Sequence, residues 1–150
     1  MILLNAYVTF TRKGLAGILA AIIAIMLVCG EVYAVNNTVK DAETNKKRVD
    51  YISGLGVTLQ SDSATAKEVT IPEEFSSVYK NYNKLQKKSG FNLEGYKGTV
   101  VTLYAYPIAT PNGYNGSWNC NLLVYNGRVI GGDISSVELN GYMLPLMKIN

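Results

Sequence analysis

The sequence lacks the residues on which most enzymes rely for acid–base and metal chemistry. Its 150 residues include no histidine, which is both the commonest proton carrier near neutral pH and the commonest metal ligand. No nucleophile-elbow, zinc-protease, paired-cysteine or phosphate-loop pattern occurs either. The sequence therefore indicates no catalytic residue, no metal site and no cofactor.

Cysteine is scarce as well. The two cysteines, Cys29 and Cys120, are too few for a disulfide scaffold. Cys29 falls in an apolar run and Cys120 in a predicted strand, so we do not expect the two to pair within one chain. We interpret Cys120 as a small buried hydrophobic residue.

Negative charge is absent before Glu31. All 11 acidic residues lie at or after Glu31, whereas Arg12 and Lys13 are the only members of the 14 basic residues that precede it. The chain from Glu31 onward therefore has one more positive than negative charge. Because a protein that binds nucleic acid needs a basic footprint, we exclude nucleic acid as a partner.

An uncharged apolar run, GLAGILAAIIAIMLVCG, extends from Gly14 to Gly30. Its length is at the lower limit of a membrane-spanning helix, about 17 residues. Arg12 and Lys13 precede it and favour a cytoplasmic N-terminus, because positive charge beside a span is not readily translocated. We predict a short cytoplasmic tail over residues 1–13, a transmembrane anchor over 14–35 and an extracytoplasmic domain over 36–150. The membrane is then a partner of the protein through residues 14–35.

Two alternatives share this orientation. Val32-Tyr33-Ala34 presents small or aliphatic residues at the two key positions of a signal-peptidase site, so cleavage after Ala34 would release a secreted domain. Lipidation at Cys29 is the weaker alternative, because Val28 stands where a lipobox has Gly, Ala or Ser.

The spacing of apolar residues predicts two helices. The first extends from Asn36 to Gly54, with Asn37 or Thr38 available as its cap. The second, Pro72–Ser89, has a proline at its first position and acids in its first turn, and Gly90 ends it. Its apolar stripe, which we assign to the core, consists of Phe75, Val78, Tyr79, Tyr82 and Leu85.

Lysines gather on the opposite side of the second helix. A solvated surface is their ordinary role, and contact with anionic lipid or an anionic envelope polymer is the functional alternative. These residues are Lys80, Lys84, Lys87 and Lys88.

Strands are predicted where β-branched and aromatic residues alternate. Val57–Gln60 and Glu68–Ile71 are short candidates, and Thr99–Tyr106 is a clearer one. The tail after Ile134 is expected to supply a last strand or to cap the core.

The strongest local signal is a β-hairpin. Trp118–Tyr125 and Arg128–Ile134 flank Asn126-Gly127, the pair that a two-residue type I′ turn prefers. The register that follows places Tyr125 opposite Arg128, Leu123 opposite Ile130 and Cys120 opposite Asp133.

The order helix, strands, helix, strands is typical of an α+β fold. We predict an N-terminal transmembrane helix followed by a small domain of two helices packed on an antiparallel sheet of about four to five strands.

Aromatic residues are the one compositional excess, with 11 tyrosines. Such rings stack on sugars or grip peptides, and several lie near the end of the strand Thr99–Tyr106 and in the loop beyond it. Asp133 adds a lone carboxylate, although a turn cap is its simpler interpretation and no second acid lies within metal-loop spacing. The candidate ligand-binding surface consists of Tyr104, Tyr106, Tyr114, Trp118 and Asp133.

Three blocks of sequence carry a resemblance to a known family. The first joins Arg48-Val49 with Leu55-Gly56. The second is IPEEFSSVYKNYNKLQKKSGFNLEGYKG, from Ile71 to Gly98, and the third is NLLVYNGRVIGGDISS, from Asn121 to Ser136. Gly141-Tyr142-Met143 extends the likeness.

Through these blocks the chain resembles, from about Lys47 to Met143, an uncharacterised family of membrane-anchored Gram-positive bacterial proteins, domain of unknown function 4830. The resemblance implies an anchor and a location in the bacterial envelope. It brings no known activity and no catalytic or binding residue.

We therefore predict a membrane-anchored extracytoplasmic module that binds or interacts at the bacterial cell envelope without catalysis, with an envelope polymer or a protein as its partner. One alternative is an envelope enzyme acting on glycan or peptide, which two or more convergent carboxylates in a concave pocket would favour. Another is an exported protein released by signal peptidase.

Overall fold

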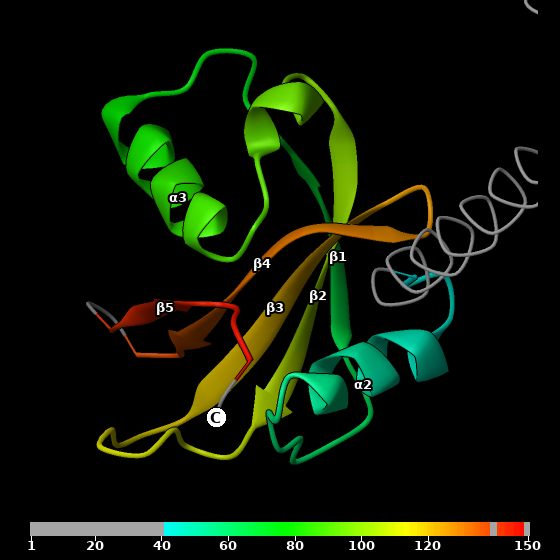
Figure 1. The fold of residues 1–150 in the computed structure, drawn as a ribbon, viewed down its shortest axis with the longest axis vertical. Coiled ribbons are helices and arrows are strands. Elements are labelled where there is room, and N and C mark those ends of the chain that lie inside the picture. Colours follow the sequence, from blue (N-terminus) through cyan, green and yellow to red (C-terminus); the bar gives the residue numbers. More distant parts are fainter. Residues whose placement is uncertain (1–40, 139–140, 149–150) are drawn as a thin grey trace, which may run out of the picture. The chain divides into compact units, whose positions relative to one another are not determined.

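A five-stranded antiparallel sheet forms the centre of the domain in the computed structural model of the chain (Figure 1). The structure describes residues 41–138 and 141–148. Each strand pairs with the next one in sequence, so the sheet is a meander without crossovers. The strands are β1 (Thr65–Thr70), β2 (Val100–Ile108), β3 (Trp118–Tyr125), β4 (Arg128–Ser136) and β5 (Met143–Pro145).

Helices cover both faces of this sheet. They are α2 (Asn45–Gly54), α3 (Ser77–Lys88) and the short 3-10 helix η1 (Leu93–Tyr96). Leu122 of β3 packs in the cluster that contains residues of α2, and Leu123 packs in the cluster that contains residues of α3 and η1. Because successive side chains of a strand point to opposite faces, α2 and α3 lie on opposite sides. The prediction of an α+β domain with two helices on an antiparallel sheet is confirmed.

The predicted transmembrane anchor, residues 14–35, lies outside the described residues, as do the predicted tail 1–13 and Cys29. Within residues 41–138 and 141–148, no helix combines the length and the apolar character needed to cross a bilayer.

Helix α2 begins later than the sequence pattern predicts. Thr44 is its cap, and the Thr44 hydroxyl accepts a hydrogen bond of 3.3 Å from Lys47 N. Before Thr44 the chain is held elsewhere, because Ala42 N donates to Gly127 O at 2.7 Å and Asp41 forms a β-bridge with Arg128. The expectation that one helix runs from Asn36 to Gly54 is therefore wrong over residues 41–44.

Helix α3 also begins later than predicted. Ile71 extends the pairing of β1 with the segment that leads into β2, because Ile71 N donates to Thr99 O at 2.9 Å and Gly98 N donates to Ile71 O at 2.8 Å. The helix starts only after Ser76, whose hydroxyl accepts a hydrogen bond of 3.2 Å from Tyr79 N. Pro72, Glu73 and Glu74 thus precede the helix instead of forming its first turn. Gly90 follows it with a φ of 76°, as expected for a left-handed helix end.

The buried side of α3 is more polar than the predicted apolar stripe. Val78 is 77% exposed, whereas Asn83 and Gln86 are buried. The reason is that both amides satisfy backbone groups of the neighbouring elements. Asn83 Oδ1 accepts from Leu93 N at 2.8 Å, and Gln86 Oε1 accepts from Gly132 N at 2.8 Å.

One predicted strand is reduced to a single bridge, and two others have shifted limits. Val57–Gln60 contributes a single β-bridge, Leu59 with Ile108, instead of a strand. Strand β1 starts at Thr65, earlier than expected, and β2 continues past Tyr106 through Pro107 to Ile108. The expectation of a last strand from the tail is confirmed by β5.

The β3–β4 hairpin has the predicted turn but not the predicted register. Asn126 and Gly127 have φ values of 47° and 71°, as a type I′ turn requires. Tyr125 pairs with Arg128 as expected, and Val124 pairs with Val129. Leu123 then pairs with Gly131, so Ile130 is an extra residue in β4. This bulge places Cys120 opposite Ile134 and Asn121 opposite Asp133, which corrects the predicted Cys120–Asp133 pair.

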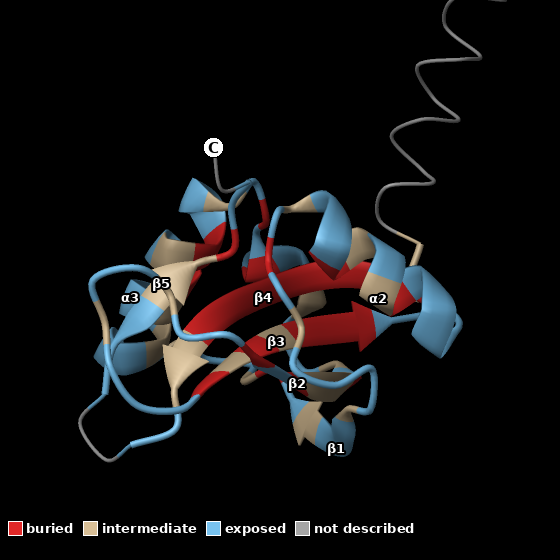
Figure 2. Cartoon of the chain, turned by 90° about the horizontal axis from the view of Figure 1, so that it is seen from below, coloured by how far each residue is buried: buried red, intermediate tan, exposed pale blue. Residues whose placement is uncertain are grey.

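Burial is concentrated along β3 and β4 (Figure 2). On the α2 face the buried residues include Ile52, Tyr106, Trp118, Cys120 and Ile134. On the α3 face they are Ile71, Leu93, Val101, Leu123 and Ile130. Cys120 is fully buried as a free thiol, as predicted, and burial raises its pKa to about 12.

Candidate functional site

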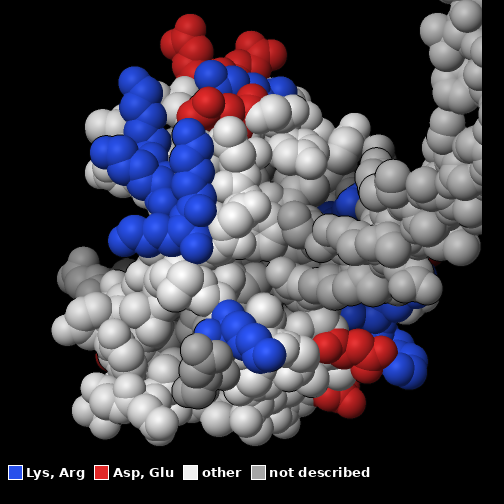
Figure 3. Space-filling model, viewed as in Figure 1, with Lys and Arg blue, Asp and Glu red and all other residues white. Residues whose placement is uncertain are grey.

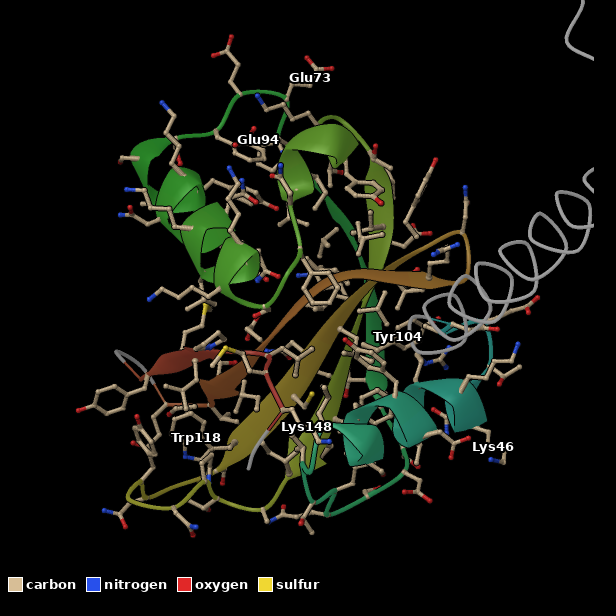
Figure 4. All side chains as sticks on the ribbon, in the orientation of Figure 1. Lys46, Glu73, Glu94, Tyr104, Trp118 and Lys148 are labelled. Atoms are coloured by element: carbon tan, nitrogen blue, oxygen red, sulfur yellow. The ribbon has the colours of Figure 1, made fainter. Side chains whose placement is uncertain are left out.

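A pocket lined by aromatic and polar residues lies at the end of the sheet where β3 begins and β4 ends. Its volume is about 540 Å³. Trp118, labelled in Figure 4, is the first residue of β3 and marks its position in the fold. We name it the aromatic pocket, and it is lined by Gly113, Tyr114, Asn115, Trp118, Ser136, Glu138, Gly141 and Tyr142.

The loop between β2 and β3 forms one wall of the aromatic pocket. Tyr114 N donates to Pro111 O at 3.1 Å, which closes a turn. The Thr110 hydroxyl donates to Gly116 O at 2.8 Å, and Trp118 Nε1 donates to Asn115 O at 2.9 Å. These bonds hold the loop in one shape, so Tyr114 is presented by a constrained backbone.

Three aromatic rings meet in this pocket. The Tyr114 ring packs edge-on against Trp118 and Tyr142, with centroid separations of 4.9 Å and 5.4 Å. Trp118 is only 2% exposed, whereas Tyr142 is 66% exposed. Such edge-to-face contacts stabilise the arrangement. The buried Trp118 therefore supports Tyr114, and the Tyr142 ring is left largely accessible to solvent.

The connection between β4 and β5 forms the opposite wall and carries Glu138. Val137 N donates to Ser117 O at 2.9 Å, which ties this connection to the β2–β3 loop. The Glu138 carboxylate lies against Gly116, where a side chain would collide with it. Gly116 has a φ of 79°, and this left-handed backbone conformation favours glycine. Among the described residues, no ion pair involves Glu138.

Tyr104 and Tyr106, two members of the predicted ligand-binding surface, lie away from the aromatic pocket. Both surround Arg48 of α2 (Tyr104 is labelled in Figure 4). Arg48 Cζ is 3.8 Å from the centre of the Tyr104 ring, and Arg48 Nε donates to the Tyr106 hydroxyl at 2.9 Å. That hydroxyl in turn donates to Asn45 Oδ1 at 2.8 Å. Tyr106 is fully buried, and this cluster joins α2 to β2.

Asp133, the last member of the predicted surface, is neither in the aromatic pocket nor a turn cap. It lies inside β4 on the α3 face and is 3% exposed. Its two carboxylate oxygens accept hydrogen bonds from the Tyr82 hydroxyl at 2.9 Å and from Asn121 Nδ2 at 2.8 Å. Burial raises the pKa of the Asp133 carboxyl, and these hydrogen bonds offset part of the rise.

Carboxylates gather in a second, smaller pocket of about 350 Å³ beside α3 and η1. Glu73, Glu74 and Glu94 line it together with Lys80 and Lys97. Lys87 lies 3.0 Å from Glu94 and holds the pKa of Glu94 below its usual value. Glu94 is thus an ionised ion-pair partner and is poorly suited to act as a general acid. Among the residues that the structure describes, no group of three or more potential ligands is arranged to hold a metal ion.

A third hollow, of about 550 Å³, lies between the end of α2 and β5 and is mainly aliphatic. Its lining includes Ile108, Leu144, Pro145 and Met147, with Lys148 at one side (labelled in Figure 4). Its lining contains none of the residues of the predicted ligand-binding surface. Specific ligand sites combine apolar surface with a few polar groups that orient the ligand, and the aromatic pocket fits that description better.

The predicted lysine cluster forms a band on the outer side of α3, visible in Figure 3. All of its members are exposed, and Lys87 is engaged with Glu94. We call this surface the lysine face, and it consists of Lys80, Lys84, Lys87 and Lys88.

The sequence pattern identified only part of the aromatic pocket. Tyr114 and Trp118 were singled out and do meet, but Tyr142 and Glu138 were not assigned to the site. The available signal was weak, because both follow β4 in a segment with no strong periodicity. Their contribution depends on how β4 and β5 bring that segment back beside the β2–β3 loop.

Comparisons with known proteins add one match. The model of a family described as Domain of unknown function (DUF4830) matches residues 51–134. The matched stretch contains Tyr114 and Trp118 and ends before Ser136, Glu138 and Tyr142. No curated protein and no solved structure matches the chain.

Proposed function

The chain belongs to this family of domains of unknown function, DUF4830, and on that premise we propose that it is a non-catalytic binding module whose ligand site is the aromatic pocket. The observation that carries the proposal is the arrangement of the rings. Tyr142 is largely exposed beside Tyr114, and a buried Trp118 holds Tyr114 in place. Aromatic rings of this kind supply much of the binding energy at recognition sites.

The polar groups of the pocket support a role in recognition. Asn115, Ser136 and Glu138 line it between the rings. A ligand that covers Tyr142 would also meet an amide, a hydroxyl and a carboxylate, which orient a ligand and make binding selective.

We further propose that the module is held at the outer side of a bacterial membrane by residues 14–35, with residues 1–13 in the cytoplasm. The uncharged run Gly14–Gly30 and the basic pair Arg12-Lys13 support this location. Release after cleavage at Ala34 is the alternative, and detection of a mature chain that starts at Val35 in the culture medium would establish it.

The first described residues lie at the end of β3 that is remote from the aromatic pocket. Asp41 and Ala42 pair with the β3–β4 turn, whereas Trp118 stands at the other end of β3. β3 has 8 residues, so the two ends are about 25 Å apart at about 3.3 Å per residue. Asp41 and Ala42 therefore leave the lining of the aromatic pocket uncovered.

An envelope enzyme acting on glycan or peptide is the second candidate, and the pocket that holds Glu73, Glu74 and Glu94 is the place where it would act. The role of a binding module is favoured over that of an enzyme, because Lys80 and Lys97 share this pocket and Glu94 is paired with Lys87. Such charge balance suits a solvated surface better than a catalytic acid–base pair.

The fluorescence of Trp118 tests the proposal directly, because it is the only tryptophan in the chain. The full chain, kept in a polyoxyethylene detergent, would be titrated with soluble peptides and glycans released from bacterial envelopes. We expect a saturable fluorescence change that Tyr142→Ala abolishes.

Tyr125→Ala is the matched control, because Tyr125 is also exposed and paired with one ring, Tyr96, at the far end of β3. It should leave binding intact. Equal titration curves for the wild type and Tyr142→Ala would overturn the proposed site. Conversion of the added peptides or glycans to smaller products, lost in Glu73→Gln, would favour the enzyme instead.

A further inference from the structure

The aromatic pocket has an unbalanced charge. Glu138 is the only charged residue in its described lining, and no lysine or arginine contributes to it. No ion pair among the described residues neutralises the Glu138 carboxylate. Glu138 is also exposed, so a ligand can reach it from solvent. The pocket therefore presents a negative charge that a bound group of opposite charge would complement.

The aromatic rings reinforce this preference. The faces of tyrosine and tryptophan rings are electron-rich and attract cations within about 6 Å. Tyr142 and Tyr114 lie in the same pocket as Glu138, and their centroids are 5.4 Å apart. A cation bound beside Glu138 is thus placed near ring surface, and its aliphatic stem can lie along the same rings.

Exposed aliphatic and sulfur-containing side chains neighbour two lining residues of the pocket in sequence. Val137 precedes Glu138 and is 60% exposed, and Met143 follows Tyr142 and is 48% exposed. Together with Tyr142 they are exposed apolar side chains on the segments that carry the lining residues Glu138 and Tyr142. Such flanks suit a polypeptide, whose neighbouring residues can cover them, better than a small polar solute.

We infer that the aromatic pocket binds a basic side chain of a polypeptide, with the ammonium or guanidinium group at Glu138 and the aliphatic stem against Tyr142 and Tyr114. The inference rests on the proposed function and specifies the chemical class of the ligand. An anionic ligand would be repelled by Glu138, and a neutral ligand would gain no attraction from its charge.

The experiment compares small probes that differ only in the group they present. N-acetyl-lysine methylamide and its arginine analogue carry the cation, the norleucine analogue carries only an aliphatic chain, and glucosamine carries an ammonium on a sugar. Each would be titrated into the full chain in a polyoxyethylene detergent, which contains neither sugar nor ammonium, while the fluorescence of Trp118 is recorded. We expect the lysine and arginine probes to bind roughly three- to tenfold more tightly than the norleucine probe.

Variants identify the side chain that recognises the positive charge of the probe. Glu138→Gln should weaken the lysine probe roughly three- to tenfold and leave the norleucine probe unchanged. Tyr142→Leu should weaken the lysine probe while Tyr142→Phe retains it, because only the phenylalanine keeps a ring. Glu94→Gln is the control, because it removes one carboxylate from an exposed site that is not part of the aromatic pocket.

The outcomes separate this inference from the proposed function. Equal binding of the lysine and norleucine probes, unaffected by Glu138→Gln but lost in Tyr142→Leu, would overturn the inference and leave the pocket as a binding site. Glucosamine that binds where the lysine and arginine probes do not would also overturn it, in favour of an amino sugar. Responses that no variant of Tyr142 or Glu138 changes would contradict both.

Discussion

The Tyr82 hydroxyl of α3 donates a hydrogen bond of 2.9 Å to Asp133 Oδ2 of β4. Asp133 is 3% exposed, and Asn121 Nδ2 is bound to its other oxygen at 2.8 Å. A buried carboxylate is costly unless its oxygens are hydrogen-bonded. The Tyr82–Asp133 hydrogen bond therefore joins α3 to the sheet, and its contribution to stability can be measured by substitution.

Removing the Tyr82 hydroxyl should destabilise the domain. Tyr82→Phe keeps the ring but leaves Asp133 Oδ2 without this donor, and the expected loss in unfolding free energy is about 1–3 kcal/mol. Urea denaturation of the two proteins measures it. Tyr79→Phe is the control, because Tyr79 lies on the same helix and is only partly buried. An equal effect of the two substitutions would mean that the Tyr82–Asp133 bond contributes nothing specific.

The stability of the domain should depend on the ionisation of Asp133. Burial raises its folded-state pKa above the unfolded value. The stabilisation that the protonated Asp133 carboxyl gives the folded state is complete below the unfolded pKa, about 3.9. It is lost as the pH rises through the folded pKa. Asp133→Asn cannot titrate, so its stability relative to the wild type should increase as the pH is raised from about 4 to about 7.

Urea denaturation at several pH values checks this prediction, and a pH-independent difference would contradict it. The groups that face Asp133 are Tyr82 from α3, Asn121 from β3 and Ser135 from β4 itself. Asp41 and Glu94, whose pKa values are lowered by Lys47 and Lys87, give the opposite trend. Asp41 and Glu94 are present in both the wild type and Asp133→Asn, so their contribution cancels when the stabilities of the two proteins are compared.

The β3–β4 turn should not tolerate a branched side chain at Gly127. Gly127 has a φ of 71°, and a Cβ there would lie 3.3 Å from Glu43 Cβ. Gly127→Val should therefore cost about 1–2 kcal/mol, mainly through left-handed strain. Asn126→Gly is the control, because glycine accepts the φ of 47° found at that position. A neutral Gly127→Val in chemical denaturation would show that the turn relaxes.

Arg48 should not be replaceable by lysine. It is 7% exposed, and its Nη1 donates to Ala42 O at 2.8 Å in addition to the Nε bond to Tyr106. A lysine cannot make both bonds and stack on Tyr104 at once. We expect Arg48→Lys to lower the unfolding free energy by about 2–3 kcal/mol.

The matched control for Arg48 lies on the same helix. Lys46 forms an ion pair of 2.6 Å with Asp50, but its side chain is 82% exposed. Lys46→Gln should therefore change the stability by less than about 0.5 kcal/mol. Similar losses for Lys46→Gln and Arg48→Lys would mean that the buried cluster around Arg48 is not special.

The lysine face should affect association with anionic surfaces without affecting the fold. Changing Lys80, Lys84 and Lys88 together to Gln should leave the unfolding free energy almost unchanged, because all three are exposed. If this face contacts anionic lipid or polymer, which is the functional alternative to simple solvation, the triple variant should bind anionic vesicles more weakly, most clearly at low salt. Sedimentation of the full chain with vesicles of increasing phosphatidylglycerol content measures the difference, and identical sedimentation would assign the lysines to solvation alone.

Much of the secondary structure could be predicted because it depends on short-range chemistry. The limits of β3 and the turn at Asn126-Gly127 follow from local φ preferences and from the flanking β-branched residues. The start of α3 could not be predicted in the same way. Ile71 is held by Thr99 and Gly98, which are distant in sequence, and this pairing displaces the helix start from Pro72 to Ser77.

The candidate site was only half predictable. Tyr114 and Trp118 are near neighbours in sequence, and the structure joins them as expected. Tyr106 precedes the same loop but is drawn into the core by Arg48 and Asn45, both from α2. An aromatic side chain on a strand is buried or exposed according to whether a helix covers that face of the sheet. The local sequence pattern does not contain this information.

By itself, the sequence determined an α+β domain with a type I′ turn between β3 and β4, because local propensity and apolar periodicity specify both. Only the tertiary structure decided which face Asp133 occupies. The extra residue Ile130 shifts the pairing by one position, and such a shift reverses the face of every side chain beyond it, so Asp133 lies against Tyr82 and not opposite Cys120. Likewise, Glu138 and Tyr142 reach the same pocket as Trp118 only because the pairing of β3, β4 and β5 returns the chain to that end of the sheet.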